Sequence, residues 1–280
     1  MRFLLVAMAV AAGHAALSAA SDQESETVTF TSSSDTFLGS ASSSIELLRK
    51  DNFLSGLESP ALNAKTSEEF AKLVKEINAE TPIPDVARGA ANVQYDVVLQ
   101  PGHYGRKTGK VGTAGKLVSE RALVAFVAGQ IAAELRRKGF KVLVVSADSY
   151  IVDDQSTPAW EGLSAKTFVA IHADGNVKAC STGPSLGYSP GTSPHAMHAI
   201  GLAISQALGY KYADFMKDNF TANESKYYMF QNVKSDGLKG LLEIGELTCE
   251  ADEKSLVEHS TLLAGNIAHA VNFILTLPSQ

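Results

Sequence analysis

Hydrophobic and polar positions follow two different periods in the second two thirds of the chain. From residue 93 onward, short apolar runs bounded by turn residues predict strands, and longer segments with apolar residues at helical spacing predict helices. This alternation is typical of an α/β domain with one twisted, mostly parallel sheet and helices on both faces. We predict strands near residues 95–99, 141–146, 167–171 and 240–244, and helices near residues 119–138, 195–208 and 251–275.

The helix that begins after Ser119 has the clearest signals at both ends. Ser119 is a favourable N-cap residue, and Glu120 is the first helical position. Apolar residues from Leu123 to Leu135 share one broad face, and Gly139 ends the pattern. We therefore predict with these signals a helix that begins at Ser119, has one broad apolar face and ends before Gly139.

Three segments of different composition precede this domain. Residues 1–20 combine one cation, an apolar stretch and small residues at the end, which predicts a secretory signal peptide. Residues 21–44 are rich in Ser, Thr, Asp and Glu, which predicts a flexible linker. Apolar residues recur at helical spacing in residues 45–57 and 67–77, so residues 45–92 are predicted to form a small helical appendage.

The role of residues 45–80 stays open, because these helices would be suited to covering a site, docking a partner or packing on the domain. The apolar stretch of the signal peptide is too short and too rich in Ala for a membrane span, and no later segment qualifies. We therefore expect an exported protein without a transmembrane segment. Its oligomeric state is not predicted.

The charge of the chain argues against a nucleic-acid partner. The formal net charge is −6, and no basic run is present. The two cysteines, Cys180 and Cys249, both lie in the exported part. In an oxidising compartment a disulfide is expected, with two buried thiols as the alternative, and the absence of a CxxC spacing argues against zinc ligation.

Four residues with chemically useful side chains lie at the predicted carboxyl edge of the sheet. His103 follows the first strand, His172 the third, and Glu243 lies in the last strand, while Glu120 opens the helix that returns from the same edge. Two imidazoles and one carboxylate, with a fourth position open to water, can form a catalytic zinc site. The alternatives are structural, hydrogen-bonded histidines and a Glu120 that only stabilises its helix N-terminus.

A second pair of histidines and two short asparagine motifs have simpler interpretations. His195 and His198 are three residues apart in a predicted helix, with no third ligand nearby, and are expected on its polar face. Asn219 and Asn223 each match a glycan acceptor pattern, but the sequence does not show whether either residue is glycosylated.

From about residue 93 to the end, the chain resembles the zinc-dependent N-acetylmuramoyl-L-alanine amidases of cell walls. The resemblance rests on VVLQPGH at residues 97–103, SERALVAFVAGQIAAELRRKGFKV at 119–142, FVAIHADG at 168–175 and LLEIGE at 241–246. It implies that residues 93–280 form the catalytic domain and that His103, Glu120 and His172 bind Zn²⁺. It also implies that Glu243 is the general base.

The implied reaction is hydrolysis of the amide between N-acetylmuramic acid and L-alanine. The substrate would be peptidoglycan or a muropeptide, and the protein would be secreted or located in the periplasm or cell envelope. Zinc-bound water would be the nucleophile, because zinc lowers the pKa of that water towards about 7.

The chain departs from the usual family pattern at four of the quoted or neighbouring positions. Gln100 replaces an Asp, Tyr104 replaces a Gly, and Glu246 and Cys249 stand where a Phe and an Asn are usual. These departures leave two alternatives open. One is a zinc peptidase or amidase of the same fold that acts on another amide, and the other is a non-catalytic module that binds the cell wall.

Overall fold

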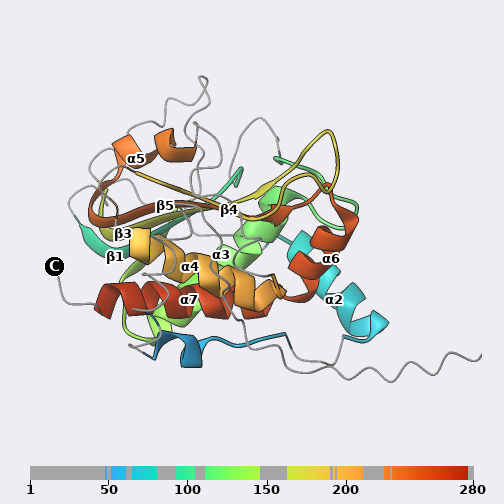
Figure 1. Ribbon diagram of the computed structural model, residues 1–280, viewed down its shortest axis with the longest axis horizontal. Coiled ribbons are helices and arrows are strands. Elements are labelled where there is room, and N and C mark those ends of the chain that lie inside the picture. Colours follow the sequence, from blue (N-terminus) through green and yellow to red (C-terminus); the bar gives the residue numbers. More distant parts are fainter. Residues whose placement is uncertain are drawn as a thin grey trace, which may run out of the picture. The chain divides into compact units, whose positions relative to one another are not determined.

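A five-stranded sheet forms the centre of the protein in the computed structural model (Figure 1). Within the described residues the strand order is β2-β1-β3-β5-β4, and among these strands only β4 runs antiparallel to its neighbour. The predicted α/β class with a mostly parallel sheet is confirmed. The strands span Gln94–Pro101 (β1), Val142–Val144 (β2), Ser164–Asp174 (β3), Ser185–Tyr188 (β4) and Lys234–Glu246 (β5).

The structure describes residues 48, 52–60, 65–80, 93–104, 111–145, 163–189, 192, 194–210, 224–227 and 229–276, all within the unit Ser32–Gln280. The predicted signal peptide and linker lie outside these residues, as do Asn219 and Asn223. Among the described residues, no helix is both long enough and apolar enough to cross a bilayer.

The central strands are covered on both faces, which explains their continuous apolar runs. Val97, Val98 and Leu99 of β1 are all fully buried.

Strand β4 was not predicted from the sequence. Its four residues include a glycine and show no clear alternation, so only pairing with β5 defines it as a strand.

Three long helices pack on one face of the sheet (Figure 1). Helix α3 (Glu120–Arg137) contacts β1, β2 and β3, α4 (Pro194–Leu208) contacts β4 and β5, and α7 (Ser260–Thr276) contacts β3, α3 and α4. On the opposite face, the described residues include only the short helix α5 (Met229–Asn232) and the 3-10 turn η4 (Glu224–Lys226). The core on that face contains Val98, Phe168, Ala170, Met229, Phe230, Val233 and Leu241.

The start and end of α3 agree with the sequence prediction. The Ser119 hydroxyl accepts a hydrogen bond from the backbone N–H of Ala122, and Gly139 follows the helix with a φ of 90°. Local chemistry therefore defines both ends of the helix.

The predicted helix over residues 251–275 is wrong as a single element. It consists of α6 (Glu250–Glu258) and α7, which are separated at His259 with φ −104° and ψ 10°. The Ser260 hydroxyl donates to the Val257 carbonyl, which satisfies a carbonyl at the end of α6. Because the apolar spacing continues across His259, the pattern of the sequence does not indicate this break.

The described part of the appendage packs on the sheet-and-helix domain. Helix α2 (Ser67–Asn78) has a capping box formed by Thr66 and Glu69, and it contacts α3 and α6. The other predicted helix is seen only in part, as Leu48 and a 3-10 helix, η1 (Phe53–Gly56). Phe53 is buried and stacks on His269 of α7.

Candidate active site

His103, Glu120 and His172 meet at the carboxyl edge of the sheet. The Nε2 atom of His103 lies 3.2 Å from Oε1 of Glu120, and Nδ1 of His172 lies 3.0 Å from the same oxygen. One candidate ligand atom from each residue lies within 4.8 Å of the others. The structure therefore brings together the three residues that the sequence analysis selected.

The local backbone explains how the three side chains approach so closely. His103 occupies the left-handed region with a φ of 59°, which is uncommon for a residue with a side chain and costs free energy. A Cβ atom on Gly102 would lie 2.5 Å from the ring of His172. Packing against a candidate ligand therefore requires a glycine at position 102.

Gly112 has a similar role that the sequence analysis missed. Its φ is 76°, and a Cβ atom at this position would clash with the Glu120 carboxylate and lie 2.6 Å from Cδ2 of His103. A glycine shortly before a helix start was the only signal in the sequence. That signal is weak because many turns contain glycine.

Backbone donors and a second buried carboxylate hold Glu120 in place. Its Oε2 accepts a hydrogen bond of 2.9 Å from the backbone N–H of Thr113, and its Oε1 accepts one of 3.4 Å from Ala173. Glu253 of α6 in turn accepts hydrogen bonds from the backbone N–H groups of residues 116–118, in the loop that leads into α3. Backbone N–H groups therefore hold the carboxylate of Glu120 in position.

The electrostatics of Glu120 favour its ionised form. Burial alone would raise the pKa of this carboxyl group, but the hydrogen bonds and charges of His103 and His172 outweigh burial and lower the pKa to about 2. Glu120 is therefore an anion at neutral pH, as a metal ligand must be.

Glu243 lies beside this cluster on the neighbouring strand, where it pairs in register with His172. Burial raises the pKa of the Glu243 carboxyl well above its usual value, and the nearby carboxylates of Glu120, Asp174 and Glu224 add to this effect. Its Oε2 atom is buried and makes no hydrogen bond in the described part of the chain. A carboxyl group in this state is suited to exchanging a proton with a substrate.

The cluster of three residues fits a zinc ion. Two imidazole nitrogens and one carboxylate oxygen are a common set of protein ligands for catalytic zinc. Two histidine nitrogens face a single carboxylate oxygen at 3.0 and 3.2 Å, an arrangement that a cation at the centre would stabilise. The other ring nitrogen of His103, Nδ1, is buried without a hydrogen-bond partner in the described residues.

Comparison with known protein families places this site in a functional context. Residues 97–272 match the family model described as N-acetylmuramoyl-L-alanine amidase. The chain belongs to this amidase family. Its members are hydrolases, and zinc dependence is a general property of the family, so this amidase is a hydrolase. No curated protein sequence gave a significant match.

Two solved structures of amidases are similar to this chain. The catalytic domain of CwlV from Bacillus (Paenibacillus) polymyxa var. colistinus is 22% identical, with a TM-score of 0.50, over 63% of this chain and 96% of that one. The amidase AmiC2 of Nostoc punctiforme is 20% identical, with a TM-score of 0.48, over 65% of this chain and 97% of that one. The first of these likenesses supports the sheet-and-helix fold described above.

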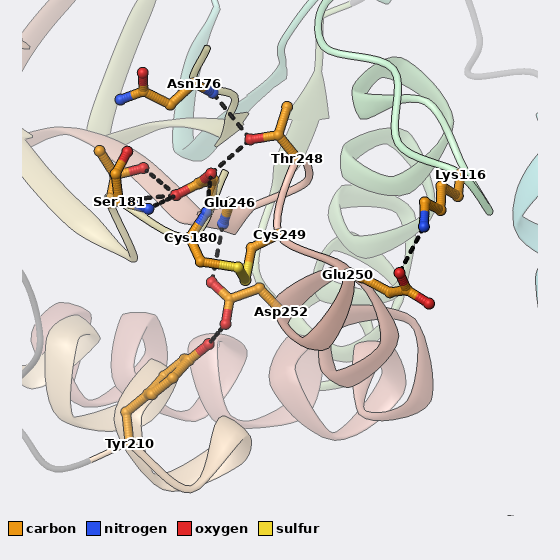
Figure 2. The surroundings of a disulfide bond; sticks show 11 residues. Lys116, Asn176, Cys180, Ser181, Tyr210, Glu246, Thr248, Cys249, Glu250 and Asp252 are labelled. Atoms are coloured by element: carbon orange, nitrogen blue, oxygen red, sulfur yellow. Dashed lines mark hydrogen bonds and ion pairs between the residues drawn. A yellow bond between two sulfur atoms is a disulfide. The ribbon is translucent and has the colours of Figure 1, made fainter. Parts of the chain in front are cut away.

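A disulfide bond and a buried carboxylate connect the loops that follow β3 and β5 (Figure 2). The predicted bond between Cys180 and Cys249 is present, with Cα atoms 4.6 Å apart. Both oxygens of Glu246 accept hydrogen bonds from the same loop, including those from the backbone N–H groups of Cys180 at 2.8 Å and Thr182 at 2.7 Å. Two of the four departures from the family pattern, Glu246 and Cys249, thus have a structural explanation.

One interpretation of the remaining histidines is wrong. His198 is completely buried within α4, so it does not belong to a polar helix face. The predicted helix was correct, but the spacing of the two histidines did not show which side of the helix faces the core.

Removal of the disulfide should destabilise the amidase without unfolding it at neutral pH. The bond closes a loop with a sequence separation of 69 residues. The chain-entropy model values such a constraint at roughly 4 kcal/mol, and measured losses are often smaller. Urea unfolding of a Cys180→Ser, Cys249→Ser double variant should show a lower midpoint than the oxidised protein, and reductant should shift only the wild type. Equal midpoints would contradict a stabilising role.

Glu246→Gln should lower the free energy of unfolding of the amidase, and the loss should be largest at neutral pH. Burial opposes ionisation of Glu246, but hydrogen bonds from Thr248, Thr182 and Cys180 outweigh it and hold the pKa below its usual value. A lowered pKa in the folded state stabilises the protein above about pH 5, and this contribution is lost as the pH falls through about 4 and below.

The free energy of unfolding should be measured in metal-chelating buffer, so that acid release of a metal does not contribute. The variant should lose about 1–3 kcal/mol at pH 7 and less at pH 3. Glu250→Gln is the matched control, because the ion pair of Glu250 with Lys116 is exposed and should contribute little. A loss in the Glu246 variant that is the same at both pH values would argue against the charged hydrogen bonds as its cause.

Proposed function

We propose that the chain is an exported zinc enzyme that hydrolyses the amide between N-acetylmuramic acid and L-alanine in peptidoglycan. The observation that carries the proposal is the convergence of His103, Glu120 and His172 around one carboxylate oxygen, with Glu243 on the adjacent strand. Family membership supports the amidase chemistry. Export rests on the predicted signal peptide in residues 1–20 and is consistent with the disulfide.

The proposed roles follow from the chemistry of each side chain. His103, Glu120 and His172 would hold the zinc ion, which supplies Lewis-acid activation of the scissile carbonyl and of a water molecule. Glu243 accepts a proton from the attacking water and passes it to the leaving amine nitrogen. Burial and, to a smaller extent, the surrounding carboxylates raise the pKa of Glu243, which suits a group that must first take up a proton and then release it.

The positions of the departures from the family pattern favour peptidoglycan over another amide substrate. Within the described part of the chain, Glu246 and Cys249 contact the loop after β3 and not the three candidate ligands. Gln100 contacts Tyr227, which in turn contacts the side of His172 away from Glu120. None of these changes removes a ligand or the proposed base, which argues against a non-catalytic module.

The purified protein should contain about one zinc ion per chain, and His172→Ala should lose most of it. Changes to residues that merely orient ligands often cost 10–100-fold in metal affinity, so loss of a ligand should cost at least as much. Metal content is measured by elemental analysis after dialysis, and acid should also release zinc because protons compete for both histidines. Full occupancy in a His103→Ala, His172→Ala double variant would disprove the site.

Digested peptidoglycan should release peptides with a free L-alanine amino terminus, and Glu243→Gln should prevent that release while retaining zinc. The expected loss in rate is roughly 10²–10⁴-fold, the range for a positioned acid–base group. Mass spectrometry identifies the bond that is cleaved, and elemental analysis checks the metal. Cleavage at a different amide would favour the alternative substrate, and loss of zinc from the variant would make Glu243 a ligand.

A further inference from the structure

We propose that Tyr227 and Gln100 are positioning residues that fix the tautomer and orientation of His172 for metal binding. This inference rests on the proposed zinc site and adds two residues to it that come from other elements. Tyr227 lies between η4 and α5, and Gln100 lies in β1. The Tyr227 hydroxyl lies 2.6 Å from Oε1 of Gln100 and 3.2 Å from Nε2 of His172.

The number of available hydrogen atoms determines which group donates in each hydrogen bond between His172, Tyr227 and Gln100. A phenol has one hydrogen, and Tyr227 donates it to the carbonyl oxygen of Gln100. The phenol oxygen therefore meets His172 as an acceptor, so Nε2 of His172 carries a hydrogen. In a neutral imidazole the other nitrogen, Nδ1, then has a free lone pair.

That lone pair points to the centre of the candidate metal site. Nδ1 of His172 lies 3.0 Å from Oε1 of Glu120, and both atoms are acceptors in this tautomer. Two acceptors at this separation need a cation between them: a proton there gives the hydrogen bond to Glu120 described above, and a metal ion can take the place of that proton. The chain of hydrogen bonds therefore prepares His172 as a ligand, in the way that a carbonyl or carboxylate behind a histidine does in other metal sites.

The packing around Tyr227 holds the hydroxyl in place. The rings of Tyr227 and His172 meet edge to face at 5.7 Å, and Phe230 packs on Tyr227 at the same centroid distance. Phe230 itself packs on Phe168 of β3. Tyr227 thus has an aromatic support that joins it to the core on the α5 face of the sheet.

Gln100 supplies an acceptor without adding another negative charge. It is fully buried, and its amide nitrogen makes no hydrogen bond within the described residues, so only its oxygen takes part. Four carboxylates, Glu120, Asp174, Glu224 and Glu243, already interact in this region. A neutral amide orients Tyr227 without increasing their mutual repulsion, which accounts for a buried side chain that is only half satisfied.

Zinc affinity measured by chelator competition tests the inference on the full protein. Tyr227→Phe keeps the ring and removes the hydroxyl, and it should weaken zinc binding by roughly 10–100-fold. Gln100→Met removes the acceptor at similar size and should weaken binding in the same direction. Gln100→Glu restores an acceptor oxygen and should bind zinc more tightly than Gln100→Met.

A matched control separates this effect from the general loss of a partly buried tyrosine hydroxyl. The hydroxyl of Tyr210 donates to Asp252 of α6, away from the three candidate ligands. Tyr210→Phe should lower the free energy of unfolding and leave zinc affinity unchanged. The double variant of Tyr227→Phe and Gln100→Met should bind zinc no more weakly than the worse single variant, because both changes break the same chain.

Nitrogen-15 NMR of the zinc-loaded protein provides a readout that a merely structural role would not change. The wild type should show an Nε2–H proton of His172 that exchanges slowly with water, and Tyr227→Phe should lose this protection. Wild-type zinc affinity in both Tyr227→Phe and Gln100→Met, with the protected proton retained, would overturn the inference. A wild-type protein that binds no zinc would instead contradict the proposed function.

Discussion

The oxygen of Glu120 that two histidines share is the constraint on which the site depends. It lies at the N-terminus of α3, while the histidines come from the ends of β1 and β3. Because β1 and β3 are parallel neighbours, both histidines reach the same edge of the sheet. Because α3 packs beneath β1, β2 and β3, its first residue returns to that edge.

Buried carboxylates that accept backbone N–H groups are a recurring device around this edge. Glu253 holds the loop that leads into α3, and Glu246 holds the loop that follows β3. Both residues belong to the segment that follows Glu243, so one stretch of chain organises the loops on two sides of the candidate ligands. The disulfide from Cys249 reinforces one of these connections covalently (Figure 2). Such charge-assisted bonds are stronger than neutral ones, which suits loops that must keep a fixed shape.

The electrostatic character of the site follows from the same packing. Histidines lower the pKa of Glu120, whereas burial and neighbouring carboxylates raise that of Glu243. Two glutamates near one edge of the sheet thus differ in their tendency to hold a proton, which would suit one of them to bind a cation and the other to accept a proton. Gln100 fits this picture, because a neutral acceptor orients Tyr227 where another carboxylate would add repulsion.

The sequence by itself determined the elements with strong local signals and the chemistry at their ends. The apolar runs of β1 and β3, the cap at Ser119 and the positions of His103, Glu120 and His172 all follow from local patterns and the geometry of parallel sheets. The contacts of Tyr227 with Gln100, 127 residues apart, and of Glu253 with Val118, 135 residues apart, were decided only by the tertiary structure. Strand β4 and the break between α6 and α7 at His259 were also decided only by the tertiary structure. Periodicity reports which face of an element is buried, but hydrogen-bond partners depend on which distant groups the folded chain brings within about 3 Å.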